Sequence, residues 1–362
     1  MDQQVRLGVI GAGVIGNMHM RNIRDGKCPE IIVTAVADTS AEQLERLSEL
    51  AVFNTAAALL ESGLVDAALI TTPHYDHPAL AIECFKHGIH VMLEKPVGVY
   101  TKQVSEMNRA ADESGVVFGV MYNQRTDHVF RKLKEIVDSG KLGRIRRVSW
   151  IVTDWYRSQA YYDSGTWRAT WSGEGGGVLL NQCPHNLDLL QWICGMPVMV
   201  DAKMHFGKWH DIEVEDDVTA YMEFENNATG TFITSTGDTP GSNRFEITFD
   251  GGKLIAEGGK ITMWELEQFE QDFSHVNKEL FGSPGVTETI VETDGKSEQH
   301  AGVLNAFAGA VLRNEPLIAD GREGIKGLML SNAMHLSAWK GKSINLPIDE
   351  DDFYKELMKK VK

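Results

Sequence analysis

The chain has 362 residues, of which 43% are hydrophobic and 24% are charged, a composition that is ordinary for a soluble globular protein. Its formal net charge of −16 at pH 7 argues against nucleic-acid binding, which relies on clustered lysine and arginine. No apolar run approaches the ~20 residues that span a bilayer, and Met1–Gln4 do not resemble the start of a secretory signal. The four cysteines form no CxxC pair, so we expect free thiols and a cytoplasmic location. Because this length exceeds the usual size of one hydrophobic core, two domains are expected.

The first motif along the chain is a glycine-rich turn between a short apolar run, residues 7–10, and a helical segment at residues 14–24. In the spacing Gly-x-Gly-x-x-Gly, the first glycine allows a tight turn and the second lets the backbone approach a pyrophosphate. The third lets the helix pack closely on the strand. Phosphates are expected at the helix N-terminus, where free N–H groups and the helix dipole favour anions. The residues expected to hold the cofactor here are Gly11, Gly13, Val14, Ile15 and Gly16.

Asp38 ends the next apolar run, residues 31–37, at about the twenty-residue offset that a dinucleotide site requires. A carboxylate there can accept hydrogen bonds from both ribose hydroxyls of NAD, and it repels the 2′-phosphate of NADP. Thr39 and Ser40 supply no arginine for such a phosphate, so NAD is predicted in preference to NADP. An alternative is that Asp38 is the N-cap of the helix that begins near Ala41.

The first ~120 residues alternate strands and helices, which predicts an α/β domain with a doubly wound parallel sheet. Further strands are expected at residues 67–71, 89–93 and 116–120, with helices at 78–86 and 102–114. Ligands of such sheets bind beyond the carboxyl ends of the strands, so the segments that follow the strands are expected to converge on one crevice. These segments are Gly11–Gly16, Thr72–His77, Glu94–Pro96 and Met121–Arg125, and in the middle two we expect Thr72, Pro73, His77, Glu94 and Lys95 to contact the cofactor.

Beyond about residue 125, period-two alternation predicts an α+β domain with a large, mostly antiparallel sheet that has one covered face. Strands are expected at residues 145–152, 218–224, 229–234, 244–249, 253–256 and 261–264, with helices at 129–139, 186–194, 303–313 and 324–340. We therefore predict an NAD-binding Rossmann domain over residues 1–124 and a substrate-binding domain over residues 125–362. The second face of the sheet is expected to be open, which makes it a surface for assembly into a dimer or tetramer.

Two positions are candidates for acid–base chemistry. Lys95 lies between Glu94 and Pro96 at a strand end, where the proline holds the lysine backbone extended. Beside a nicotinamide, a lysine can hydrogen-bond a substrate hydroxyl and stabilise the charge that develops as the proton leaves; the alternative is an exposed lysine in a turn. His185 follows three consecutive glycines, with Asn181 four residues before it. A neutral histidine can take the proton of a secondary alcohol, although a helix cap or a core position is the alternative.

Taken together, these motifs resemble those of the Gfo/Idh/MocA family, named for glucose–fructose oxidoreductase and inositol dehydrogenase. In chain order they are the glycine turn with Asp38, Thr72-Pro73 with His77, Glu94-Lys95-Pro96, and Gly175-Gly176-Gly177 with His185 and Asp188. The resemblance implies NAD(P)-dependent oxidation or reduction of a sugar, polyol or related pyranoside, with Lys95 and His185 as the catalytic pair. Many members carry an aspartate where this chain has Asn181, so we expect Asn181 to bind a substrate hydroxyl without forming a charged dyad with His185.

Aromatic residues and arginines gather in the stretch between residues 155 and 168, which also contains Tyr161-Tyr162. Aromatic faces and fork-shaped donors suit a sugar ring, and they equally suit a hydrophobic cover over the domain junction. The residues expected to bind substrate are Asn123, Arg125, Trp155, Tyr156, Arg157, Trp167 and Arg168, together with Asn181 and His185. The histidines and cysteines within residues 74–77 and 84–90 start and end different elements, so no metal site is predicted.

The leading prediction is an NAD-dependent dehydrogenase that acts on a secondary hydroxyl of a sugar, inositol or glycoside. A second is an NAD-dependent glycoside-cleaving enzyme, in which transient ring oxidation acidifies a neighbouring C–H and permits elimination of the aglycone. A third is a non-catalytic NAD-binding sensor or regulator, against which the presence of both Lys95 and His185 argues.

Overall fold

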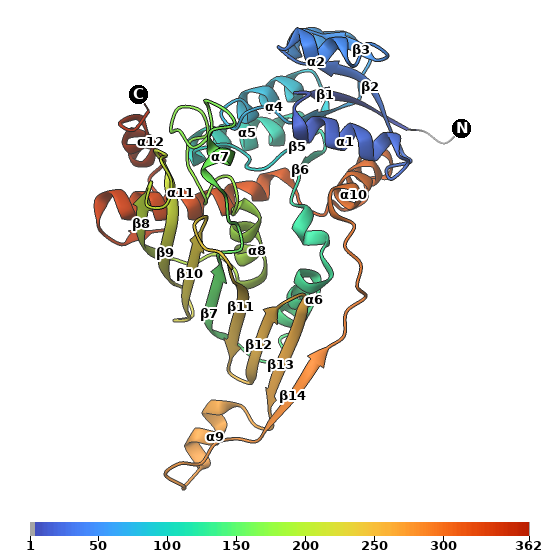
Figure 1. The fold of residues 1–362 in the computed structure, drawn as a ribbon. Coiled ribbons are helices and arrows are strands. Elements are labelled where there is room, and N and C mark those ends of the chain that lie inside the picture. The colour runs from blue at the N-terminus through green and yellow to red at the C-terminus, as the bar shows by residue number, and fades with distance from the viewer. Residues whose placement is uncertain (1–3, 362) are drawn as a thin grey trace. The chain divides into compact units, whose positions relative to one another are not determined.

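The strands of the chain form two sheets, which the computed structural model describes with their helices over residues 4–361 (Figure 1). The first sheet is entirely parallel, in the order β3-β2-β1-β4-β5-β6. Its strands are β1 (Val5–Ile10), β2 (Ile31–Ala37), β3 (Ala51–Phe53), β4 (Ala67–Ile70), β5 (His90–Leu93) and β6 (Phe118–Val120). The connecting helices are α1 (Val14–Arg24), α2 (Ala41–Glu45), α3 (Ala56–Glu61), α4 (His77–Lys86) and α5 (Thr101–Ser114), followed by the 3₁₀ helix η1 (Asn123–Thr126).

This is the predicted doubly wound Rossmann topology. The strand order reverses between β1 and β4, so the turn after β1 opens at the switch point where ligands of such sheets bind. The helix expected to begin near Ala41 is α2. The short elements β3 and α3 were not predicted, because segments of three to six residues are too short to show a periodic pattern.

A helix from late in the chain completes the core of this first unit. In α10 (Gln299–Arg313), Val303, Leu304 and Phe307 are buried in one apolar cluster with Val9 of β1 and Met20 of α1. The unit therefore consists of residues up to 126 together with 173–175 and 298–328, which include the 3₁₀ helix η2 (Gly321–Glu323). The chain first leaves this unit after residue 126, close to the predicted boundary between residues 124 and 125, and it then returns to the unit twice. Burial of the apolar face of α10, which sequence order cannot reveal, decides the assignment.

The second unit contains residues 127–172, 176–297 and those from 329 onward. Its sheet has the order β14-β13-β12-β11-β7-β10-β9-β8-β15, and β7 and β10 are the one parallel pair among the described strands of this second sheet. The strands are β7 (Ile145–Val152), β8 (Met199–Phe206), β9 (Glu215–Glu223), β10 (Thr229–Ser235), β11 (Asn243–Phe249), β12 (Gly252–Glu257), β13 (Lys260–Leu266), β14 (Val286–Val291) and β15 (Ile344–Asn345). The helices are α6 (His128–Asp138), α7 (Gln159–Tyr162), α8 (Pro184–Cys194), α9 (Glu270–Val276) and α12 (Glu350–Met358), and α11 (Gly324–Lys340) runs from the first unit into the second.

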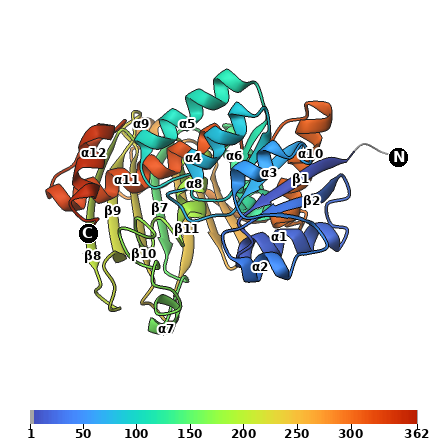
Figure 2. The ribbon, with the colours of Figure 1, turned by 90° about the horizontal axis from the view of Figure 1, so that it is seen from above.

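Alternation along these strands separates a covered face from an open one, as predicted. In β7, Trp150 is fully buried whereas the adjacent Ile151 is exposed. Helices α6, α8 and α11 lie along the covered face (Figure 2). The Phe130 ring of α6 lies 6.0 Å from that of Trp150, and the Ala202 N–H of β8 donates to the Ser337 hydroxyl of α11 at 2.9 Å.

Two further expectations concern the chain as a whole. Over residues 4–361, every helix is too short or too polar to cross a membrane. All four cysteines have free thiols, as predicted.

Candidate active site

The glycine turn after β1 has the close approaches that its spacing predicts. Gly11 has a φ of +98°, and a Cβ at Gly16 would lie 2.2 Å from the Gly11 carbonyl oxygen, so α1 can pack here only without a side chain. At Gly13, the N-cap of α1, nothing lies within 4 Å of an added Cβ. The next residues, Val14 and Ile15, are exposed, Val14 to 86%. Open space over a helix N-terminus with no acidic residue in its first turn fits the pyrophosphate of a dinucleotide.

Asp38 follows β2 and ties this turn in place. Its carboxylate accepts hydrogen bonds from the Ala12 N–H at 2.6 Å and from the Ser40 N–H at 2.7 Å. The alternative role of helix cap is wrong, because Ser40 is the N-cap of α2 and accepts from the Gln43 N–H. Each carboxylate oxygen has a second lone pair, so Asp38 retains the capacity to accept from ribose hydroxyls.

His77 joins two of the strand-end loops. Its Nδ1 lies 2.7 Å from the Pro96 carbonyl oxygen and its Nε2 lies 2.8 Å from that of Thr72. Burial lowers the pKa of His77, although the neighbouring carbonyls and carboxylates oppose this. Both ring nitrogens therefore face backbone carbonyls, and His77 joins the loops that carry Thr72, Pro73 and Pro96. Its contact with the cofactor stays a prediction.

Glu94 anchors the backbone of Lys95 to a buried negative charge. Its carboxylate lies 2.7 Å from Nε2 of His19 and accepts the Lys95 N–H at 3.1 Å. Burial raises the pKa of Glu94, but the hydrogen bond to His19 and the charges of His19, Lys95 and His300 lower it to about 2. The carboxylate is thus ionised at neutral pH, and it holds the backbone of the lysine loop. Its direct contact with the cofactor stays a prediction.

Sequence reasoning missed the two histidines beside this carboxylate. His19 belongs to α1 and is fully buried, and its ring centroid lies 5.3 Å from that of His300 on α10. Burial lowers the pKa of His300. The position of His19 one helical turn after Gly16 was a usable signal, since it places the side chain on the face that packs against the sheet. His300 gave no such signal, because its neighbourhood depends on where α10 docks.

Asn123 and Arg125, both predicted to bind substrate, are buried in η1. Asn123 donates from Nδ2 to Oε1 of Gln299, and Arg125 forms an ion pair of 2.6 Å with Glu323. The Arg125 guanidinium also lies 5.6 Å from the centroid of the Tyr122 ring. These contacts fix η1 to α10 and η2. Binding of substrate by Asn123 and Arg125 stays a prediction.

The glycine-rich segment at residues 173–177 is held on both sides by close approaches. Gly175 has a φ of +81°, and a Cβ there would lie 2.3 Å from a methyl of Val99. At Gly177 a Cβ would lie 2.0 Å from the Glu215 carbonyl oxygen. Both positions exclude any larger residue, so the path of the chain toward Asn181 is set by its glycines.

Asn181 and His185 lie on different elements. His185 is in the first turn of α8, which begins at Pro184, whereas Asn181 lies in the preceding turn, where its N–H donates to the Gly177 carbonyl at 2.9 Å. Asn181 also donates from Nδ2 to the Tyr161 hydroxyl at 3.4 Å. The hydrogen bond to Tyr161 thus orients the side-chain amide of Asn181, which the spacing of Asn181 and His185 in the sequence did not predict.

A buried ion pair lies beneath this turn, and it was not predicted. The Glu215 carboxylate accepts the N–H groups of Gly177 at 2.9 Å and Leu179 at 3.0 Å, and it lies 2.9 Å from Nε2 of His335. The charge pair therefore holds the backbone that leads into Asn181 and His185.

The aromatic segment has one direct link to α8. Nε1 of Trp155 donates to Oδ1 of Asn186 at 3.2 Å, adjacent to His185. Tyr156 and Trp167 are exposed, and Arg157 and Arg168 are half-buried. Tyr162 of the same segment is buried, so the accessible aromatic side chains here are those of Tyr156 and Trp167.

Two family models match the chain. Residues 5–122 match the model described as "Oxidoreductase family, NAD-binding Rossmann fold", and residues 130–255 match the "GFO/IDH/MocA C-terminal domain". The chain is 25% identical to myo-inositol 2-dehydrogenase of Thermotoga maritima over 94% of this chain and 98% of that protein. It is 25% identical to D-glucoside 3-dehydrogenase of Escherichia coli, over 94% of this chain and 97% of that protein. The crystal structure of the WlbA dehydrogenase from Bordetella pertussis in complex with NADH and UDP-GlcNAcA has a TM-score of 0.82 and 27% identity, covering 96% of this chain and 99% of that one.

Proposed function

The chain belongs to the GFO/IDH/MocA family of NAD-binding oxidoreductases, and we propose that it transfers hydride between NAD and a secondary hydroxyl of a sugar, inositol or glycoside. The observation that carries the proposal is the anchoring of the Lys95 backbone by the buried, ionised Glu94 at the carboxyl edge of the same sheet that presents the glycine turn. Relatives named as dehydrogenases of inositol and of glucosides support this substrate class.

Each candidate residue has a defined chemical task in this proposal. NAD, when bound, accepts the hydride that leaves the hydroxyl-bearing carbon. The Lys95 ammonium donates a hydrogen bond to the reacting hydroxyl oxygen and stabilises its developing negative charge. The His185 imidazole takes the hydroxyl proton, and the Asn181 amide binds a hydroxyl of the ring. In the reverse direction, His185 returns the proton to the alkoxide.

Asp38 supports NAD in preference to NADP. Its carboxylate is held by the N–H groups of Ala12 and Ser40. A fixed negative charge beside the ribose repels a 2′-phosphate and can accept from a 2′-hydroxyl. We also propose that copies of the chain associate through the open face of the nine-stranded sheet.

The test measures NADH formation by the purified protein with a panel of sugars, inositols and glycosides, supplied with NAD or with NADP. We expect turnover with at least one member and a preference for NAD. In K95A and H185A, we expect turnover to fall by roughly 10²- to 10⁴-fold, the range that positioned acid–base groups supply. NAD affinity, measured by calorimetry, should stay nearly unchanged in both variants.

The control is K86A, which removes an exposed lysine of α4 that pairs with Glu83. It should match the wild type in turnover. Absence of turnover on the whole panel by protein that binds NAD would contradict the proposal. Release of the aglycone from p-nitrophenyl glycosides without net NADH formation would instead identify a glycoside-cleaving enzyme.

A further inference from the structure

Two arginines in the aromatic segment lie against one tyrosine ring. The guanidinium carbons of Arg157 and Arg168 lie 5.1 Å and 4.6 Å from the centroid of Tyr161. Arg157 also lies 5.8 Å from the ring of Trp155, and Arg168 lies 4.5 Å from that of Trp167. Aromatic faces thus hold two positive charges beside the same ring.

Neither charge is neutralised by the protein. Within the described residues, no carboxylate lies within 4.0 Å of the Arg157 or Arg168 guanidinium; their hydrogen bonds go to the Tyr156 carbonyl, the Ser164 hydroxyl and the Tyr161 hydroxyl. Other arginines of the same unit do pair with acidic side chains: Arg131, Arg144, Arg146 and Arg244. In a chain with a net charge of −16, two arginines that share one tyrosine ring and both lack a carboxylate partner are available to bind an anionic ligand.

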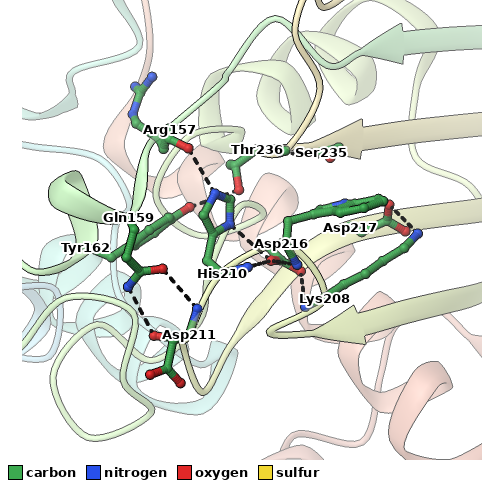
Figure 3. A network of polar contacts seen from close by, with 12 residues as sticks. Arg157, Gln159, Tyr162, Lys208, His210, Asp211, Asp216, Asp217, Ser235 and Thr236 are labelled. Carbon is green, nitrogen blue, oxygen red and sulfur yellow. Dashed lines mark hydrogen bonds and ion pairs between the residues drawn. The ribbon is translucent and has the colours of Figure 1, made fainter.

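The backbone of Arg157 is fixed from both sides. Its N–H donates to the Thr236 carbonyl at 3.0 Å, and its carbonyl accepts from Nε2 of His210 at 2.9 Å. The fully buried Asp216 in turn accepts the His210 N–H at 3.1 Å and faces its Nδ1 at 3.1 Å. Figure 3 shows this network, with the guanidinium of Arg157 extending away from it. Hydrogen bonds on both sides therefore hold the backbone of Arg157 in place, while its guanidinium lies outside this network.

Neighbouring hydrogen bonds also fix the backbone on either side of Tyr161. The Gln159 amide oxygen accepts the Asp211 N–H at 2.9 Å, and the Tyr162 hydroxyl donates to the Thr236 hydroxyl at 2.9 Å (Figure 3). Holding the backbone at these positions lowers the entropy that the arginines lose when they bind a ligand.

The arginine pair is connected to the candidate acid–base residues of its own unit. The Tyr161 hydroxyl accepts hydrogen bonds from Nη1 of Arg168 at 2.9 Å and from Nδ2 of Asn181 at 3.4 Å. Asn181 lies one turn before His185, and Trp155 donates to the residue that follows His185. A group bound by the two arginines therefore lies on the same side of this unit as Asn181.

We propose that Arg157 and Arg168 bind an oxyanion of the substrate, so that the preferred substrate is an acidic sugar carrying a carboxylate or a phosphate. This rests on the proposed function, because it names the class of sugar bound beside Asn181. Forked guanidinium donors bind planar carboxylates and phosphates through paired, charge-assisted hydrogen bonds, which a neutral hydroxyl cannot match.

The experiment measures sugar binding to the NAD-loaded protein by calorimetry. The probes are D-glucuronate, D-galacturonate and D-glucose 6-phosphate, with D-glucose and D-galactose as their neutral counterparts. We expect at least one anionic probe to bind about tenfold or more tightly than its counterpart, since a charge-assisted hydrogen bond contributes at least this much. The carboxylate and phosphate probes distinguish the two sources of the anion.

Variants identify the residues responsible. R157Q and R168Q should each reduce affinity for the preferred anionic probe by about tenfold and reduce affinity for neutral hexoses much less. R168K, which keeps the charge and removes the fork, should fall between the wild type and R168Q. The matched control is R147Q, because Arg147 is an exposed arginine of β7 that also lacks a carboxylate within 4.0 Å in the described chain. It should keep the wild-type preference.

The outcomes separate this inference from the proposed function. Equal affinity for acidic and neutral sugars, or a preference that survives in the R157Q/R168Q double variant, overturns the inference. NADH formation from neutral sugars in either case leaves the proposed function intact. Selective binding of acidic sugars without any NADH formation supports the arginine site and counts against the proposed function. Absence of both binding and turnover rejects both.

Discussion

Glu215 and His335 illustrate how single buried residues set the geometry of the candidate site. Glu215 accepts two backbone N–H groups from the turn before His185, and its charge is balanced by His335, whose Nδ1 lies 2.8 Å from the Ser331 carbonyl oxygen. Burial lowers the pKa of His335, but the charge and hydrogen bond of Glu215 and the Ser331 carbonyl outweigh it and leave the pKa raised. Glu215 therefore favours the imidazolium form of His335 in the folded state.

This raised pKa predicts a pH dependence of stability. A histidine whose pKa in the folded state exceeds its unfolded value of about 6.5 stabilises the fold fully below that pH. The contribution is lost as pH rises through the folded-state pKa. The free energy of unfolding, measured in urea, should therefore decline above about pH 6.5 for the wild type, by about 1.4 kcal/mol for each unit of the shift.

The variant H335Q should lose this component of the pH dependence and be less stable by roughly 3 to 5 kcal/mol at pH 6, since it leaves a buried carboxylate unpaired. His275, an exposed residue of α9, provides the control H275Q, which should follow the wild-type profile. An H335Q profile parallel to that of the wild type would contradict the assignment of the pH dependence to this pair.

At the scale of elements, the glycines of the turn between β1 and α1 have different structural roles. Gly16 permits the packing of α1, because an added Cβ would lie 2.2 Å from a carbonyl oxygen. Gly13 faces open space, with a φ of −70° that any residue adopts. One glycine therefore serves the fold, and the other serves the approach of a ligand.

These tasks predict opposite effects of alanine. G16A should lower the free energy of unfolding by about 1 to 3 kcal/mol, the usual cost of overpacking. G13A should leave stability within about 0.5 kcal/mol of the wild type, as expected where no strained or buried contact changes. We expect G13A to weaken NAD binding by about tenfold or more, because its methyl occupies the space that the pyrophosphate needs. Urea denaturation and calorimetric NAD titration of both variants test this, and unchanged NAD affinity in G13A would contradict it.

At the scale of the whole molecule, the nine-stranded sheet leaves one face open. Ile151 of β7 and Tyr221 of β9 are each 38% exposed on that face. Strand β10 lies between these two strands, and its Ile233 pairs with Ile151. Apolar and aromatic side chains on a broad, open sheet are typical of an interface between copies of a chain. The sheet thereby supplies the surface for the proposed assembly.

This predicts a dimer or tetramer by light scattering at micromolar concentration. Y221D should shift the protein toward monomer, because a carboxylate buried in a sheet-to-sheet interface lacks a partner. The control L64D alters an exposed leucine of the first unit and should leave the assembly unchanged. A wild-type protein that scatters as a stable monomer would rule out this interface.

Local patterns in the sequence were sufficient for much of this architecture. The predicted bounds of α1, β2, β7 and α11 agree with the structure, because each has an uninterrupted period or clear end signals. The glycine turn and Asp38 could also be predicted from the sequence, because the strand, turn and helix that carry them fix their spacing. Such features depend on neighbours within one βαβ unit.

Tertiary structure decided what depends on partners distant in the chain. Arg125 pairs with Glu323, Glu94 with His19, and Glu215 with His335. None of these pairs can be predicted from the local sequence. The return of α10 to the first unit and the convergence of Arg157 and Arg168 on Tyr161 have the same origin. Periodicity specifies which face of an element is apolar, whereas the partner of that face, and of each buried charge, is selected when the elements pack together.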